Sequence, residues 1–165
     1  MNFFFSFWAG LPAFLKVLFL SMAPLAESRV SIPLGLFVYK LDPWVNLFWA
    51  FLGNVLPAFF LYFFLKGLVG FLSENFSFFR RFFSWWFARV EKKYKKSYEY
   101  YGLVALVIFI GIPLPGTGVW TGMTAAYLFS LSFRKSILAV CLGAAIAGVI
   151  VTLASLGIFN LSGLI

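Results

Sequence analysis

Residues 100–133 read YYGLVALVIFIGIPLPGTGVWTGMTAAYLFSLSF, and this stretch decides the fold. It holds 34 residues without a charge, but the sequence IPLPGTG at positions 112–118 interrupts it. Proline removes a backbone N–H and clashes with the preceding helical turn, so a continuous helix is not expected here. The limb at 100–112 has 13 residues. These make roughly 20 Å of helix, too short for a membrane core about 30 Å thick. The stretch therefore predicts a re-entrant hairpin with a break at 113–122.

Two further charge-free runs indicate helices that cross the membrane. Hydrophobic residues make up 63% of the 165 residues and charged residues only 11%, whereas soluble domains carry about a quarter charged residues. No charge occurs in residues 43–65 or 136–165, which hold 23 and 30 residues. About 20 apolar residues suffice to cross the core as a helix. We therefore predict transmembrane helices at 44–66 and 136–160.

The chain before residue 44 predicts a second hairpin. Residues 3–23 are apolar apart from Lys16, and the sequence PLAESRVSIPLG at 24–35 then brackets a Glu and an Arg with two prolines. Because proline interrupts helices, we expect a break at 24–35 between two limbs that are short for a full crossing. If the first limb instead crossed completely, the N-terminus would lie on the cytoplasmic side.

The two halves of the chain follow one plan. Each has an apolar limb, a break rich in Pro and Gly, a second limb, a short polar turn and a spanning helix. Pro24 corresponds to Pro113 at an offset of 89 residues, and Gly53 corresponds to Gly143 at an offset of 90. One spanning helix between two hairpins makes them enter from opposite faces, and the broken segments of such inverted repeats commonly meet near the midplane. The predicted fold is an all-α integral membrane protein with two inverted-topology halves, each a re-entrant broken-helix hairpin plus a transmembrane helix.

A basic amphipathic segment, residues 71–98, joins the halves 1–70 and 99–165. Seven of the 13 Lys and Arg lie between positions 80 and 96, interleaved with Phe, Trp and Tyr. This pattern is typical of a helix on an anionic membrane surface rather than of a nucleic-acid site. Basic loops stay in the cytoplasm, so both termini are expected outside. The segment either serves topology alone or contacts lipid headgroups through Arg80, Arg81, Arg89, Lys92, Lys93, Lys95 and Lys96.

The motifs at 24–35 and 112–122 resemble the putative small multidrug export protein family. These are prokaryotic membrane proteins that look distantly related to the DedA superfamily. The resemblance covers nearly the whole chain and implies re-entrant hairpins, transport, and a place in the prokaryotic cytoplasmic (inner) membrane. The DedA-like relation points toward movement of a phospholipid or polyprenyl phosphate. The four-helix small multidrug resistance transporters have a different architecture.

Glu27 and Arg29 are the charged pair predicted deep in the membrane. Such residues are costly there, so a functional role is the default interpretation. In an extended segment alternate side chains share a face, and both would then point into one cavity. Glu27 would bind a proton or cation, and Arg29 would hold a phosphate or carboxylate. The alternative is a structural salt bridge.

Further residues are expected to line this site from both breaks and from the middle of the first spanning helix. Gly116, Thr117 and Gly118 at a helix start would present N–H donors to an anion, although close helix packing explains the glycines equally well. Asn54 is expected to hydrogen-bond a backbone group at a hairpin tip. The predicted lining residues are Pro24, Ser28, Ser31, Pro33, Asn54, Pro113, Pro115, Gly116, Thr117, Gly118 and Thr121.

The sequence favours a transporter over an enzyme. It has no His and a single cysteine, Cys141, so the common metal and nucleophile constellations are missing. No cofactor, metal or nucleic-acid partner is expected. We predict a small secondary transporter or exporter, with proton coupling through a midplane site at the two hairpin tips. The alternatives are a phospholipid or polyprenyl-phosphate flippase or scramblase for envelope homeostasis, and a structural membrane subunit that transports nothing. Anionic lipids and an unidentified small molecule, ion or lipid are the expected partners, and the oligomeric state, a homodimer included, is left open.

Overall fold

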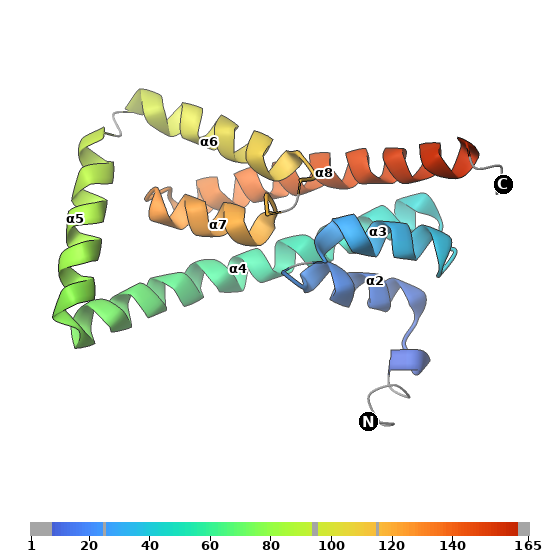
Figure 1. The fold of residues 1–165 in the computed structure, drawn as a ribbon, viewed down its shortest axis with the longest axis horizontal. Helices are drawn as coiled ribbons and strands as arrows, with labels where there is room; N and C mark the ends of the chain where they lie inside the picture. The colour runs from blue at the N-terminus through green and yellow to red at the C-terminus, as the bar shows by residue number, and fades with distance from the viewer. Residues whose placement is uncertain (1–7, 25, 94–95, 115, 162–165) are drawn as a thin grey trace. The chain divides into compact units, whose positions relative to one another are not determined.

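The computed structural model describes residues 8–24, 26–93, 96–114 and 116–161, with side chains outside 91–100 and up to residue 157. These residues form helices joined by short turns, without a strand, so the predicted all-α class is confirmed. Figure 1 shows the elements in order. They are α2 (Ala13–Met22), α3 (Glu27–Phe37), α4 (Pro43–Asn75), α5 (Ser77–Lys93), α6 (Lys96–Gly111), α7 (Val119–Leu128) and α8 (Phe133–Leu161).

Helix length separates the elements into two kinds. α4 has 33 residues and α8 has 29, which give roughly 50 Å and 43 Å of helix. Both are long and apolar enough to cross a membrane. α2, α3, α6 and α7 have only 10, 11, 16 and 10 residues. All four are shorter than a membrane core about 30 Å thick, and they are connected in pairs, α2 with α3 and α6 with α7, by short turns (Figure 1).

The surface of the long helices is apolar. On α4, Phe60, Phe63 and Phe64 are 72%, 59% and 63% exposed, and on α8 Leu153 is 64% exposed. Large apolar side chains exposed in succession mark a surface that contacts lipid or another protein rather than water.

The chain divides into two compact units, and each contains one hairpin and part of both long helices. Unit 1 comprises Met1–Leu56 and Ala144–Ile165. Its core is built around Val17, Ile32 and Ala50, all fully buried. These three residues come from α2, α3 and the first part of α4. The last part of α8 joins them, because Gly148 packs against Leu47 and Ile32.

Unit 2 comprises Pro57–Gly143. The rings of Tyr62 and Phe63 on α4 pack against Phe133 at the start of α8, with centroids 5.0 Å and 5.1 Å apart. Trp86 on α5 donates its indole N–H to the carbonyl oxygen of Leu128 at 3.0 Å. This hydrogen bond joins the basic helix α5 to the end of α7.

The two units repeat the same local features at the predicted offset. All four residues with positive φ in the described chain fall into two pairs: Glu27 (φ 43°) with Gly116 (φ 85°), and Lys40 (φ 50°) with Ser130 (φ 57°). The first pair is 89 residues apart and the second is 90 apart. The starts of α4 and α8 also lie 90 residues apart.

The close helix contacts follow the same offset. A Cβ placed on Gly53 would lie 2.3 Å from the carbonyl oxygen of Leu18 on α2, and a Cβ on Gly143 would lie 2.6 Å from Cβ of Ile110 on α6. In each unit the first limb of the hairpin therefore packs against a glycine of a long helix, with no room for a side chain between them.

Both breaks are shorter than the sequence predicted. α3 is helical from Glu27 onward and contains Pro33, so the expected non-helical segment through residue 35 is wrong. A proline can remain inside a membrane helix. Next to it, the side chain of Asn46 donates to the carbonyl oxygen of Ile32 at 2.8 Å and so joins α3 to α4. In the second hairpin α7 begins at Val119, inside the predicted break at 113–122.

Other helix ends also differ from the predicted ones, because the helices continue past the charged residues at which the sequence predicts an end. α4 runs on past Lys66 to Asn75, and α6 begins at Lys96 instead of 99. Only α5 remains of the predicted linker at 71–98.

Candidate functional site

The tip of the first hairpin holds the charged pair that the sequence selected. α2 ends at Met22, and the chain turns to enter α3 at Glu27, whose backbone N–H donates to the carbonyl oxygen of Ala23 at 3.1 Å. Glu27 has φ 43°, a left-handed conformation that costs an L-residue roughly 1–2 kcal/mol. The equivalent position in the second hairpin is Gly116, for which positive φ is free of strain. Strained backbone of this kind clusters at functional sites.

Burial is pronounced at this tip. Glu27 is 5% exposed and Ser28 is 2% exposed, while Ser31 is fully buried. Arg29 is half-buried and Pro24 is exposed. A carboxyl group buried to this degree is expensive unless its surroundings stabilise it.

The helical conformation changes how the pair is presented. α3 is helical from Glu27 onward, so the expectation that Glu27 and Arg29 lie on an unwound segment is wrong. Ser28 and Ser31 are three apart on this helix and share a face, next to Glu27. Ser31 Oγ lies 2.5 Å from Ser21 Oγ of α2, and both residues are fully buried. The first hairpin thus contains a buried polar face made of one carboxyl group and three hydroxyl groups.

Ser21 was missed by sequence reasoning because it lies in an otherwise apolar limb, where a lone serine carries little information. Pairing Ser21 with Ser31 across the predicted hairpin would have identified it. The predicted hydrogen bond of Asn54 is also wrong: Asn54 is 3% exposed, and its Oδ1 has no hydrogen-bond partner among the described residues. Asn46, in the same charge-free run, makes the predicted type of bond instead, to Ile32.

The tip of the second hairpin is not charged. Thr117 Oγ1 lies 2.7 Å from the carbonyl oxygen of Ile112 and 2.8 Å from that of Leu114. Thr121 Oγ1 lies 2.8 Å from the carbonyl oxygen of Gly116. These hydroxyl groups therefore close the turn itself rather than point at a ligand.

Glycine packing explains part of the second motif. Gly118 is buried, and a Cβ on Gly122 would lie 2.5 Å from Cδ1 of Ile110. The close approach of α6 and α7 at this point supports the packing interpretation of the motif. Pro113 is half-buried, and Pro115 lies outside the described residues.

Helix α5 carries exposed cations and a ladder of stacked rings. Phe79, Phe83 and Phe87 follow each other at intervals of four residues, with both centroid distances 6.2 Å. Arg80, Arg81 and Arg89 are exposed, and the guanidinium of Arg89 lies 5.1 Å from the centroid of the Trp85 ring. Lys95 and the side chains of Lys92, Lys93 and Lys96 lie outside the described residues.

Neutralising the first cations of α5 is expected to weaken binding to anionic vesicles. Replacing Arg80 and Arg81 by Gln should cost about 1 kcal/mol per charge near the surface. The measurement is the partitioning of a peptide spanning residues 71–93 onto phosphatidylglycerol vesicles at low salt, with Ser73→Gln and Ser77→Gln as a control for side-chain volume. Equal partitioning of all three peptides would leave these cations with a topological role only.

Two long apolar helices, two hairpins of short helices and a buried acidic residue at a hairpin tip define a helical membrane protein. A sequence model of the family described as "Putative small multi-drug export protein" matches residues 27–150. The chain belongs to this family, and the resemblance carried by the two break motifs is confirmed. The family's description names an exporter rather than an enzyme. No curated protein and no solved structure matches the chain.

Proposed function

We propose that this protein is a small secondary transporter in which Glu27 couples transport to protons. One observation carries the proposal: Glu27 is 5% exposed, has φ 43°, and stands at the break of a hairpin too short to cross the membrane. An ionisable residue at membrane depth serves a function by default. Membrane folds tolerate irregular backbone at that depth where it is buried in protein or lines a cavity. The family description adds support for export.

The roles of the two charged residues follow from their chemistry. Glu27 takes up and releases a proton on the buried polar face that it shares with Ser28 and Ser31. Arg29, on another face of α3, supplies a cation for an anionic group of the substrate, because guanidinium binds carboxylate and phosphate through two parallel hydrogen bonds. That the two hairpin tips line one site stays a prediction from the sequence.

We further propose an inverted-topology arrangement with re-entrant hairpins. It is supported by the offset of 89 and 90 residues between equivalent backbone features and by hairpin helices that are shorter than the membrane core. α4 begins in unit 1 and ends in unit 2, and α8 begins in unit 2 and ends in unit 1. The positive charge of α5 supports a cytoplasmic position for the end of α4 and the start of α8 in a prokaryotic cell.

Cysteine labelling tests this topology. In a Cys141→Ala background, single cysteines replace Trp44, Tyr101 or Arg134, which are all exposed. We expect a membrane-impermeant thiol reagent to label positions 101 and 134 from the cytoplasmic side and position 44 from the other side. If 101 and 134 were labelled from opposite sides, the second hairpin would cross the membrane and the arrangement would be wrong.

Transport itself is tested by flux in vesicles. Purified protein is reconstituted in phosphatidylethanolamine and phosphatidylglycerol vesicles with an imposed pH gradient. Three substrate classes are compared: amphiphilic cations, small anions and fluorescent phospholipids. Flux that depends on the gradient supports the proposal, passive exchange of fluorescent phospholipid indicates the scramblase alternative, and no flux in any class indicates a structural subunit.

A further inference from the structure

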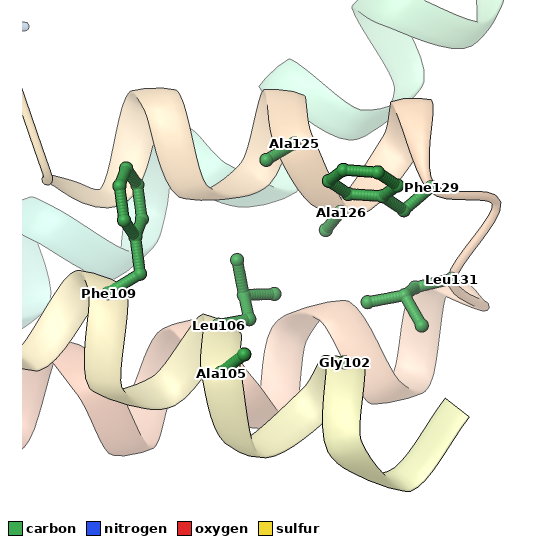
Figure 2. Close-up of a pocket in the computed structure, with 8 residues that line it drawn as sticks. All are labelled: Gly102, Ala105, Leu106, Phe109, Ala125, Ala126, Phe129 and Leu131. Carbon is green, nitrogen blue, oxygen red and sulfur yellow. The ribbon is translucent and has the colours of Figure 1, made fainter. Parts of the chain in front are cut away.

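Unit 2 contains a cavity of about 380 Å³ between α6 and α7, within the range of about 300–1,000 Å³ found for ligand pockets. Figure 2 shows Ala125, Ala126 and Phe129 on one wall and Ala105, Leu106 and Phe109 on the other. Its lining is completed by Gly102 and Leu131. None of these eight residues has a polar side chain, so the cavity suits an apolar occupant.

Two residues that line the cavity have counterparts in unit 1 with different side chains. At the offset of 89 residues Ala105 corresponds to Lys16, and at 90 residues Phe129 corresponds to Tyr39. In unit 1 the ammonium group of Lys16 lies 5.5 Å from the centroid of the Tyr39 ring, across the groove between α2 and α3. The change from Lys to Ala removes the side chain that bridges the groove.

Three further lining residues can be aligned with unit 1 in the same way. The small residue Gly102 stands where unit 1 has Ala13, and Leu106 and Leu131 stand where it has Val17 and Leu41. In unit 1, Val17 is fully buried in the core, and Leu41 packs against that core. In unit 1 the side chain of Lys16 thus occupies a position that Ala105 leaves open in unit 2.

The excess of positive charge in unit 2 indicates which kind of ligand fits the cavity. Ten of the 13 Lys and Arg lie in residues 57–143, together with only three Glu. Leu131 lines the cavity at the end where α7 leads into α8, which we call its base. Arg134 follows Leu131 on the first turn of α8. α5 contributes Arg89, three residues after Trp86, whose indole N–H donates to the carbonyl oxygen of Leu128, next to Phe129. Both arginines are exposed.

We propose that the cavity between α6 and α7 holds one acyl chain of an anionic phospholipid whose headgroup phosphate is bound at the base by Arg134 and Arg89. The acyl chain fills the apolar groove between α6 and α7. In unit 1 the side chain of Lys16 bridges the corresponding groove. The phosphate matches the excess of cations, since cationic side chains beside a membrane helix bind anionic headgroups. The site is a lipid-binding site of unit 2 and does not depend on the proposed role of Glu27.

The cavity half of the proposal is tested with purified protein by native mass spectrometry after reconstitution with phosphatidylglycerol. Wild type is expected to retain one lipid per chain through detergent exchange. Ala105→Phe fills the groove and should lose it, whereas Ile108→Phe, three residues away on the same helix and 54% exposed, should keep it. If Ala105→Phe does not fold, Ala125→Leu fills the groove from the other wall.

The headgroup half is tested by a charge pair. Arg89→Gln with Arg134→Gln should weaken retention of phosphatidylglycerol by about fivefold per charge removed. Retention of phosphatidylcholine should fall less, because its choline group offsets the charge of the phosphate. Lys40→Gln with Lys66→Gln removes the same charge at exposed positions outside α5 and α8 and should keep the retained lipid. Equal lipid retention in Ala105→Phe and Ile108→Phe would overturn the proposal. A dimer that Ala105→Phe abolishes would also overturn it, because a second copy of the chain would then occupy the groove. Unchanged retention of phosphatidylglycerol in the double variant Arg89→Gln with Arg134→Gln would overturn it as well.

Discussion

A single added methyl group at Gly53 or Gly143 is expected to destabilise the protein by roughly 2–3 kcal/mol, because packed interiors tolerate added atoms poorly. At Gly53 the new Cβ would lie 2.3 Å from a backbone oxygen of α2 and 2.7 Å from Cβ of Ser21. At Gly143 it would lie 2.6 Å and 2.8 Å from two carbons of Ile110. Backbone and β-branched atoms cannot move aside as the end of a flexible side chain does.

The matched controls are glycines in the same two helices. A Cβ on Gly67 of α4 or Gly157 of α8 would meet nothing within 4 Å. There Gly→Ala should stabilise the helix by up to about 1 kcal/mol through helix propensity. Thermal unfolding in detergent, read by circular dichroism, compares the four variants. Similar midpoints for Gly53→Ala and Gly67→Ala would mean that α2 does not pack on α4 as described.

Replacing Glu27 is expected to remove pH dependence from transport while the fold survives. Glu27→Gln keeps the size and hydrogen bonding of the side chain but removes the titrating group. Glu27→Gly copies Gly116 and relieves the positive φ, so it should unfold at a temperature no lower than Glu27→Gln, since glycine adopts this backbone conformation at no steric cost. Arg29→Lys keeps the charge but loses the planar guanidinium group, which binds an anion through two hydrogen bonds. The affinity for anions should therefore fall although the protein assembles.

A purely structural pair predicts the opposite pattern. Removing one partner would leave the other charge stranded, and breaking a buried pair costs about 3–5 kcal/mol. Glu27→Gln and Arg29→Met would then each unfold readily, and the double variant would recover. Thermal stability and flux are measured together in the singles and the double. Loss of fold in the singles with recovery of both fold and flux in the double would contradict the functional assignment.

The long helices could be predicted from sequence because about 20 apolar residues without a charge have few alternatives to crossing a membrane. Their ends were less predictable: Lys66 does not end α4, which continues through Asn75, since a lysine in a helix can extend its charge toward the surface. Pro33 was judged a helix breaker on local grounds. A proline is tolerated inside a membrane helix, and no local pattern reveals whether the helix continues through it.

The candidate site was predictable by residue type but not by geometry. Glu27 and Arg29 stood out because charges are rare in the apolar hairpins, whereas their orientation depended on whether α3 was helical. The choice of Asn54 over Asn46 failed because both lie in one apolar run and only the packing of α3 against α4 distinguishes them. Ala105, which lines the cavity of unit 2, corresponds to Lys16 in unit 1, and this difference becomes visible once the two halves are aligned residue by residue.

Flux of the wild type and of Glu27→Gln across vesicles with an imposed pH gradient tests the central claim most directly. A gradient of about two pH units can drive up to roughly hundredfold accumulation for each coupled proton, because about 1.4 kcal/mol corresponds to a factor of ten. We predict that wild type accumulates its substrate against a concentration gradient, and that Glu27→Gln, folded and equally abundant, only equilibrates it. Equal accumulation by both proteins, or accumulation by neither under any gradient, would contradict proton-coupled transport through Glu27.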